Sequence, residues 1–338
     1  MTLLGRTLSI FLLLYSSLHA NERIQIVGSS TIYPFATTVA EEFSALHSAK
    51  TPLIESTGSG SGIRIFCNKT QNYHIANASR RIKPNELKRC QDNTLKDILE
   101  LPIGFDGIAL AQHVADKKFN LSKKSLMLAL IDRVPSKDGS KLIANPYKKW
   151  SDIDPNLPKR DIHIYGPPTS SGTRDILESM ILKNIANTIE LYRDKKFGIR
   201  KDGAYIPSGE NDNLIIQKLK QDRDAIGIFG YNFLMENEDK VSGIAIDGVY
   251  PTQKSIANRS YPITRVLYLY VNIAHLKSMK SLQDYLKLFM SDTVLSPDGI
   301  LVEMGLVPLL DSDRAKARNK LKNKTPLSLR ELKKDSLK

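Results

Sequence analysis

The chain has 338 residues, enough for two domains of ordinary size, and a formal net charge of +13. After the first 20 residues no apolar segment is long enough to span a bilayer, and no repeat with a fixed short period is present, which argues against a solenoid. The positive charge suits an anionic ligand or an anionic envelope surface.

Residues 1–20 have the pattern of a signal peptide. Arg6 gives a short basic region, residues 8–15 an apolar core, and residues 18–20 (Leu-His-Ala) a small-residue cleavage site. No cysteine follows the cleavage site, so nothing indicates a lipid anchor. We therefore expect a soluble, exported protein located in the periplasm.

The first of three similar turns follows this segment. Residues 23–27 alternate like a strand, residues 28–31 (Gly-Ser-Ser-Thr) form a turn rich in hydroxyl groups, and a helix is expected from Tyr33 or Pro34. Proline is tolerated in the first turn of a helix because no hydrogen bond is lost there. The pattern predicts a strand, a turn and a helix N-terminus.

The second turn repeats this arrangement. Residues 53–56 predict a short strand, residues 57–62 (Thr-Gly-Ser-Gly-Ser-Gly) a turn, and residues 63–66 the start of a helix. A run of glycine and serine can also be a flexible linker. Its place between a strand and an apolar helix start favours the turn.

Cys67 and Cys90 are the two cysteines of the chain. An even count in an exported protein favours a disulfide over two free thiols. Between them, residues 74–78 predict a strand that ends at Ser79 and Arg80, and residues 84–90 a short helix. A bridge over this separation would contribute about 3 kcal/mol of stability through loop entropy.

The third turn is residues 170–173 (Ser-Ser-Gly-Thr). It follows strand-like residues 162–165 and precedes residues 176–185, whose apolar positions recur at helical spacing. Such a turn offers backbone N–H groups and the positive end of a helix dipole to an anion. The alternative is an ordinary helix N-cap, in which serine and threonine are favoured anyway.

The remaining segments predict strands that alternate with helices. Further strands are expected in residues 103–114, 225–231 and 261–271, and helices in residues 214–219, 282–290 and 299–304. This alternation is typical of an α/β architecture with mostly parallel sheets, in which ligands bind at the carboxyl ends of the strands.

The motifs of common nucleotide-binding and hydrolytic enzymes are absent from the sequence. There is no P-loop, no complete Gly-x-Gly-x-x-Gly and no Gly-x-Ser-x-Gly elbow with a plausible triad. None of the six histidines is assigned a metal or catalytic role. We predict no enzyme activity and no cofactor.

Six motifs of the sequence occur in the order and at the spacing that are typical of a known family. The set is residues 28–34, 58–62, 77–80 (Asn-Ala-Ser-Arg), 171–173 (Ser-Gly-Thr), 227–231 (Gly-Ile-Phe-Gly-Tyr) and 261–265 (Tyr-Pro-Ile-Thr-Arg). It resembles the PstS-type phosphate-binding proteins, the exported receptors of phosphate ABC importers, over roughly residues 23–310.

The resemblance implies a two-lobed periplasmic-binding-protein fold of type II, in which each lobe is a mostly parallel sheet flanked by helices. Lobe one would take residues 22–107 and 262–310, and lobe two residues 108–261. The two segments that cross between the lobes would act as a hinge near residues 104–107 and 263–266.

The resemblance also implies a set of phosphate ligands. From lobe one these are Ser30, Thr31 and Ser59, and from lobe two they are Ser171, Gly172 and Thr173. Two positions depart from the best-known members, which have an aspartate where this chain has Arg80 and an arginine where it has Pro167. Arginine pairs two phosphate oxygens with its planar fork, so we expect Arg80 to supply the cationic ligand. The alternative for Arg80 is a solvated surface charge.

Residues 311–338 carry ten basic and four acidic residues. With so little apolar periodicity, this segment is expected to be a basic, flexible tail. No aromatic residues are interleaved with its charges, so nucleic-acid binding is not predicted.

Together these patterns predict a monomer that captures inorganic phosphate between two lobes and delivers it to the permease of an ABC importer. The alternatives are a receptor for sulfate, molybdate or phosphonate, an exported enzyme such as a phosphatase, and an envelope adhesion or signalling protein with the same fold. The last alternative would use the basic tail to bind its partners.

Overall fold

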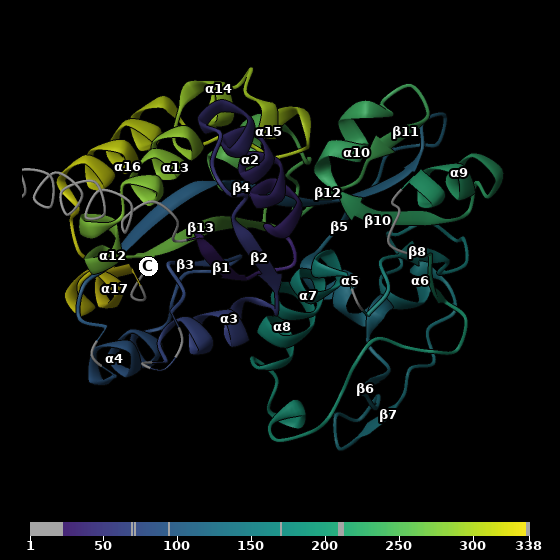
Figure 1. Cartoon of the computed structure of the whole chain (residues 1–338). Helices are drawn as coiled ribbons and strands as arrows, with labels where there is room; N and C mark the ends of the chain where they lie inside the picture. Colours follow the sequence, from purple (N-terminus) through teal and green to yellow (C-terminus); the bar gives the residue numbers. More distant parts are fainter. Residues whose placement is uncertain are drawn as a thin grey trace, which may run out of the picture. The chain divides into compact units, whose positions relative to one another are not determined.

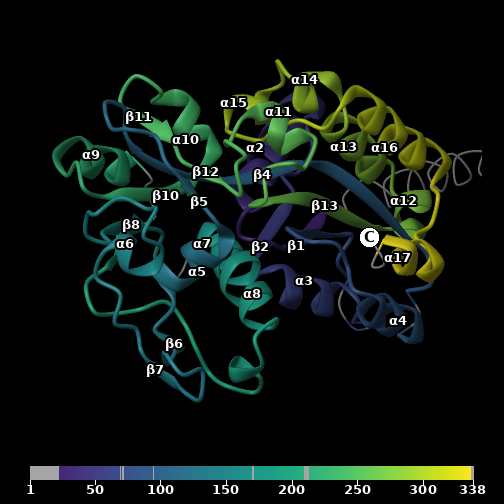
Figure 2. The ribbon, with the colours of Figure 1, turned by 180° about the vertical axis from the view of Figure 1, so that it is seen from behind.

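A computed structural model of the chain describes residues 23–68, 70, 72–93, 95–169, 171–208 and 213–335. The predicted signal peptide, residues 1–20, lies outside them. The chain divides into two compact units. Unit 1 takes the described residues within Met1–Leu101, Tyr268–Ser291 and Lys316–Lys338, and unit 2 takes Pro102–Leu267 and Asp292–Ala315. Figures 1 and 2 show the elements of both units.

The sheet of unit 1 contains the strands that end in the first two turns. Its strands are β1 (Gln25–Gly28), β2 (Leu53–Ser56), β3 (Ile75–Ala78) and the parts of β4 (Ile98–His113) and β13 (Thr264–Asn272) that belong to this unit. β1 pairs in parallel with both β2 and β3, and this register places Gly28 opposite Ser56 and Asn77. β13 runs antiparallel to β3. The carboxyl ends of three parallel strands therefore meet at one edge.

Helices cover both faces of this sheet. They are α2 (Tyr33–His47), α3 (Ser59–Phe66), α4 (Pro84–Asp92), α12 (Ile273–Ser278), α13 (Lys280–Phe289), α17 (Leu329–Asp335) and most of α16 (Asp311–Asn323). α2 and α13 lie on one face, and α3 and α4 on the other (Figures 1 and 2). On the second face, Val27 and Ala76 of the sheet pack against Ile63, Phe66 and Leu87.

The sheet of unit 2 continues from β4. β10 (Ile226–Gly230) is antiparallel to β4 and parallel to β8 (Ile164–Gly166), which in turn is parallel to β9 (Tyr205–Pro207). β11 (Val241–Gly243) also pairs with β4. Two further pairs form small sheets of their own: β5 (Asn120–Leu121) with β12 (Ala245–Ile246), and β6 (Arg133–Pro135) with β7 (Leu142–Ala144). β8 delivers the chain to the third turn.

The helices of unit 2 are short. They are α5 (Lys123–Leu130), α6 (Trp150–Ile153), α7 (Gly172–Leu177), α8 (Asn184–Ala186), α9 (Asn213–Gln221), α10 (Tyr231–Glu236), α11 (Gln253–Ala257), α14 (Asp292–Leu295) and α15 (Ile300–Glu303). α7 continues without a break through a π-helical segment (Glu178–Lys183) into α8. Among the described helices of either unit, none has the length and apolar character needed to cross a bilayer.

The predicted α/β class is confirmed, and one predicted helix start is corrected. The second turn is shorter than residues 57–62, because α3 already begins at Ser59. Four of the glycine and serine residues that were expected in the turn, residues 59–62, therefore belong to the first turn of this helix. Gly60 and Gly62 have low intrinsic helix propensity, so the sequence alone favoured a later start.

The predicted domain boundaries also differ from the structure. Residues 292–310 were expected in lobe one, whereas the structure places Asp292–Ala315 in unit 2. The reason is backbone pairing and packing: Val307 bridges to Phe105, and Val307 and Leu309 are part of the buried core of unit 2. Residues 102–107 and 262–267 likewise belong to unit 2.

The prediction of a flexible tail at residues 311–338 is wrong for the part that the structure describes. This segment forms α16 and α17, and Leu327 and Leu332 are each only 4% exposed in the core of unit 1. Its charges are partly paired, because Glu331 accepts from Lys320 at 2.8 Å and lies 3.4 Å from Arg81. A few apolar residues and specific ion pairs are thus enough to hold this charged segment in place.

We expect the substitution Leu332→Ala to lower the free energy of unfolding by about 2–4 kcal/mol, the usual cost of a truncated buried leucine. Chemical denaturation measures the change. Leu310→Ala is the matched control, because Leu310 is 50% exposed and its truncation should cost less than about 0.5 kcal/mol. Equal effects of both substitutions would show that α17 does not pack on unit 1.

Candidate functional site

Gly28 ties the first turn to the second. Its carbonyl accepts hydrogen bonds from the N–H groups of Thr57 and Gly58, each at 2.8 Å. Its φ of 138° lies in the region that favours glycine, and a Cβ here would come within 2.1 Å of the carbonyl oxygen of Asn77. Glycine is thus required where the ends of three parallel strands meet.

A second glycine allows the start of α3 to lie directly on the end of β1. A Cβ on Gly62 would lie only 2.3 Å from the Cα of Gly28. The next residues of the first turn, Ser30 and Thr31, are partly exposed and lead into α2. The N-cap of α2, Ile32, makes no side-chain cap. The first N–H groups of a helix have no partner within it, so this end of α2 is suited to an anion.

Ser59 connects the second turn with the loop after β3. Its hydroxyl accepts from the N–H of Ser79 at 2.9 Å, and the two serine hydroxyl oxygens lie 3.0 Å apart. Ser59 is also the first residue of α3. The predicted ligand Ser59 and the Asn-Ala-Ser-Arg segment are therefore in direct contact.

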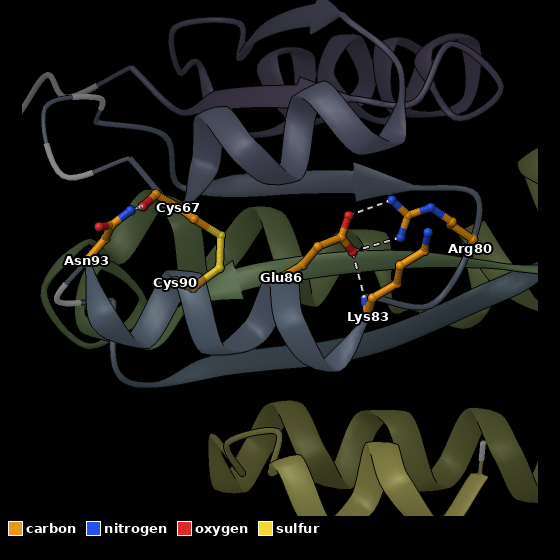
Figure 3. The surroundings of a disulfide bond; sticks show 6 residues. All are labelled: Cys67, Arg80, Lys83, Glu86, Cys90 and Asn93. Atoms are coloured by element: carbon orange, nitrogen blue, oxygen red, sulfur yellow. Dashed lines mark hydrogen bonds and ion pairs between the residues drawn. A yellow bond between two sulfur atoms is a disulfide. The ribbon is translucent and has the colours of Figure 1, made fainter. Parts of the chain in front are cut away.

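Arg80 lies beside the start of α3 and is held there by Glu86. Its two terminal nitrogens donate to the two carboxylate oxygens of Glu86 at 2.8 and 2.7 Å, as Figure 3 shows. A Cβ built on Gly60 would be 3.6 Å from Nη2 of Arg80. The Arg80 side chain remains 35% exposed, so it is neither buried nor fully solvated.

Glu86 also fixes the start of α4. One carboxylate oxygen accepts from the N–H of Lys83 at 2.8 Å, which is the backbone half of a capping box. Burial opposes ionisation of Glu86. The bonds from Arg80 and Lys83 together outweigh it and hold the pKa of this carboxyl below its ordinary value of 4.5.

The next residues of the loop are fixed from the opposite side. The guanidinium of Arg81 donates to Glu100 on β4 with a shortest distance of 2.7 Å. The N–H of Ile82 donates to the hydroxyl of Tyr270 at 2.7 Å, and this hydroxyl donates to Glu100 at 3.0 Å. The loop that carries Arg80 is therefore held by hydrogen bonds along its whole length, which favours a single conformation.

The predicted disulfide between Cys67 and Cys90 is present. It joins the end of α3 to α4, and the side chain of Asn93 donates to the carbonyl of Cys67 at 3.1 Å (Figure 3). The bridge thus connects the helix that begins with Ser59 to the helix that carries Glu86. Ser59, which is bonded to Ser79, and Glu86, which is bonded to Arg80, therefore lie on two helices that are joined by a disulfide.

The third turn places three predicted residues at the start of α7. Ser171 is the N-cap, and its hydroxyl accepts from the N–H of Thr173 at 3.2 Å. Ser171, Gly172 and Thr173 are all partly exposed, while Ser170 lies outside the described residues. The Ser171 hydroxyl therefore acts as an ordinary helix N-cap, which was the alternative interpretation of this turn.

The segment before this turn is fixed at Pro167, the position where the resemblance led us to look for an arginine. The carbonyl of Pro167 accepts from the hydroxyl of Tyr205 at 2.6 Å and from Arg174 at 3.3 Å. Arg174 also donates to Glu178 at 2.8 Å and lies over the Tyr205 ring, 4.8 Å from its centre. Arg174 is buried and supports the turn from within.

The sequence did not assign a role to Arg265 and Asp106, which lie next to the third turn. Nη2 and Nε of Arg265 donate to one carboxylate oxygen of Asp106 at 3.2 and 3.3 Å, and Nη2 lies 3.5 Å from the carbonyl oxygen of Gly172. Burial raises the pKa of Asp106, although the Arg265 charge opposes this change.

The predicted ligands are divided between the two units. Ser30, Thr31, Ser59 and Arg80 belong to unit 1, and Ser171, Gly172 and Thr173 belong to unit 2. Sequence reasoning missed the residues that hold the two arginines, Glu86 and Asp106. Glu86 had a usable signal, since it stands three residues after Lys83 at a helix start. Asp106 is paired with a residue 159 positions away and had none.

The chain is thus an α/β protein of two units, each with glycine and hydroxyl residues at the start of a helix. These features are those of a substrate-binding protein. The model of the PBP superfamily domain matches residues 16–293, and the chain belongs to this family.

Two of the following three similar proteins have names that refer to phosphate. The chain is 27% identical over 299 residues to the phosphate-binding protein PstS of Staphylococcus saprophyticus, covering 87% of this chain and 82% of that protein. It is 29% identical over 288 residues to protein SphX of Synechococcus elongatus, covering 83% of this chain and 76% of SphX. The crystal structure of a possible phosphate binding protein from Planctomyces limnophilus has a TM-score of 0.71 at 23% identity, covering 90% of this chain and 99% of that one. This likeness confirms the predicted fold class.

The lowered pKa of Glu86 predicts a pH-dependent contribution to stability. Its contribution is fully present above the ordinary glutamate pKa and is lost as pH falls through the lower pKa of the folded state. We expect wild type to lose more stability than Glu86→Gln between about pH 6 and about pH 3, measured by denaturant unfolding. Glu42→Gln, at an exposed position on α2, is the control and should keep the wild-type profile. A Glu86→Gln profile parallel to wild type would contradict the pairing with Arg80.

Proposed function

We propose that this chain is an exported receptor that binds inorganic phosphate and delivers it to the permease of an ABC importer. The relatives named above support the ligand, and the family supports a receptor role. The proposed ligands are Ser30, Thr31, Ser59 and Arg80 from unit 1, together with Ser171, Gly172 and Thr173 from unit 2.

The observation that carries this proposal is the arrangement at the carboxyl end of the unit 1 sheet. There the carbonyl of Gly28, in the turn before α2, accepts from the N–H groups of Thr57 and Gly58 before α3, and Arg80 lies beside the start of α3. Helix N-termini bind oxyanions through N–H groups and the helix dipole, and arginine adds two parallel donors. Because Glu86 holds the arginine in advance, little conformational entropy would be lost when the anion binds.

The donors of this site are hydroxyl groups, backbone N–H groups and arginine, and such donors bind phosphate without covalent chemistry. Donors of these kinds suit any tetrahedral oxyanion. Sulfate carries no proton at neutral pH, whereas phosphate does, so an acceptor for that proton would favour phosphate. The relatives favour phosphate, and sulfate, molybdate or phosphonate binding are outcomes of the test below.

The proposal includes export of the chain to the periplasm and an interaction with the permease. The signal-like residues 1–20 and the disulfide suit an oxidising compartment such as the periplasm. There the receptor would act as a monomer and meet the permease at the inner membrane, and no nucleic acid or catalytic step is part of this role.

We expect isothermal titration calorimetry to show saturable, one-to-one binding of phosphate to the mature protein, and weaker binding of sulfate. Arsenate has the shape and protonation of phosphate and should bind as well. The substitution Arg80→Ala should weaken phosphate binding about 10- to 100-fold, because it removes charge-assisted hydrogen bonds to the anion.

Arg89→Ala is the matched control for this experiment. Arg89 is exposed on α4, so its removal changes the net charge equally but should leave the affinity close to that of wild type. A wild-type protein that does not bind phosphate would remove the proposed function. Equal affinities of Arg80→Ala and Arg89→Ala would remove only the role of Arg80.

Export predicts cleavage after Ala20. When the full-length chain is expressed in a Gram-negative host, the periplasmic fraction should contain a protein whose N-terminal sequence begins at Asn21. The substitution of residues 9–13, within the apolar core, by charged residues should retain the uncleaved chain in the cytoplasm. A full-length protein that keeps Met1 in the periplasm, or that stays in the cytoplasm as wild type, would contradict the signal peptide.

A further inference from the structure

Net charge is divided unequally between the two units. Without the predicted signal peptide, the sequence of unit 1 has 22 basic and 11 acidic residues, whereas that of unit 2 has 26 basic and 25 acidic residues. The difference is +11 for unit 1 and +1 for unit 2. The proposed phosphate site uses only Arg80 of this surplus, and Glu86 offsets its charge. The rest of the surplus has no role in the proposed function.

Part of this surplus lies at the end of unit 1 where α4, α16 and α17 meet. α17 packs on α4, and α16 leads into α17 (Figures 1 and 2). Lys320, in the last turn of α16, donates to Glu331 of α17 at 2.8 Å. We name this region the basic end of unit 1, and its exposed basic residues are Lys83, Lys88, Arg89, Lys96, Lys322 and Arg330.

These six side chains are accessible to a partner. Each is exposed, and none forms an ion pair within the described part of the chain. On α4, Lys88 and Arg89 lie on the face that points away from the core, because Leu87 and Cys90 are the buried residues of this helix. Basic side chains without acidic partners create a local positive potential, which attracts an anionic surface.

The acidic residues of the basic end offset only part of its charge. Asp92 and Asp97 are exposed, so two acidic side chains stand against the six basic ones. Glu331 is already shared by Lys320 and Arg81, which are not among the six. The basic end therefore favours an anionic partner.

A bilayer fits this surface better than a nucleic acid does. The helices α4, α16 and α17 contain no aromatic residue on which a base could stack. Anionic phospholipids form a broad negative surface, which attracts clusters of Lys and Arg without a shaped pocket. None of the exposed large apolar side chains in the described part of the chain lies on these helices, so the contact would be electrostatic and would not include insertion.

We propose that the basic end of unit 1 binds to the surface of bilayers that contain anionic phospholipids. This proposal rests on the proposed function, in which the exported receptor meets its permease at the inner membrane. Each Lys or Arg close to such a surface strengthens binding by about 5-fold. Several such residues would keep the receptor near the membrane and raise its effective concentration at the permease.

Co-sedimentation of the mature protein with lipid vesicles tests this proposal. At low ionic strength the wild type should bind to vesicles of equal parts phosphatidylglycerol and phosphatidylcholine, and not to vesicles of phosphatidylcholine alone. The triple variant Lys88→Glu, Arg89→Glu and Arg330→Glu should bind at least about 100-fold more weakly, because three attractive charges are removed. Salt at about 0.5 M should release the wild type, because it screens the attraction.

A triple variant of unit 2 is the matched control. Lys137→Glu, Lys195→Glu and Lys196→Glu change the net charge by the same amount at exposed positions, and this variant should keep most of the vesicle binding. Equal losses in the two variants would show that net charge alone drives the binding, and would overturn the role of the basic end. A wild type that does not bind to the anionic vesicles, or that binds more tightly to single-stranded DNA, would overturn it as well.

Calorimetry with inorganic phosphate separates this surface from the phosphate site. Both triple variants should bind phosphate like the wild type, and their thermal unfolding checks that they fold. At constant ionic strength, phosphate that saturates the site should leave the wild type on the vesicles. Its release would place a lipid headgroup in the phosphate site and reject the proposal. A wild type that binds to the anionic vesicles but not to phosphate rejects the proposed function alone.

Discussion

The close approach at Gly28 is the constraint on which the arrangement of unit 1 depends. One carbonyl accepts two N–H groups of the second turn, and one missing side chain allows β3 to come within contact of β1. A residue with a Cβ at Gly28 or Gly62 would collide with backbone atoms, which cannot move without separating the strands. The first turn of α3 lies on the end of β1, and β1 lies against β3, because these two glycines have no side chain.

Within each unit, arginine side chains are held by carboxylates. Glu86 holds Arg80, Glu100 holds Arg81, and Asp106 holds Arg265. Arg80, the arginine of the proposed ligand set, therefore has its orientation set before a ligand arrives, which would lower the entropic cost of binding. The pairing with Glu86 also limits the net positive charge beside Arg80, so the proposed site would select an anion by directed donors more than by charge.

The sequence was informative where structure is local. The strand, turn and helix at residues 25–47 could be predicted because the apolar spacing, the turn residues and Pro34 all act over a few positions. The resemblance added the order of the motifs and hence the fold class. The pairing of the two cysteines followed from their count and the expected export.

What the sequence could not provide is contact between distant residues. Arg265 pairs with Asp106, which is 159 positions away in the sequence, and no local pattern predicts this pair. The charged segment from residue 311 was expected to be flexible because its apolar residues are sparse. Leu327 and Leu332 are nevertheless buried in a core that consists mainly of residues from the first hundred positions, together with Tyr270. The glycine-rich composition of residues 58–62 led to a predicted helix start that is too late, because glycine has a low helix propensity. In the structure α3 begins at Ser59, where it packs against β1.

The central claim is that N–H groups of turns in both units bind one anion. Amide chemical shifts, followed by ¹⁵N NMR during a titration with phosphate, test it most directly. The account predicts that the amides of Ser30, Ser59, Gly60, Gly172 and Thr173 shift together and saturate at one common dissociation constant. Shifts confined to exposed lysines, or turns that saturate at different phosphate concentrations, would contradict it.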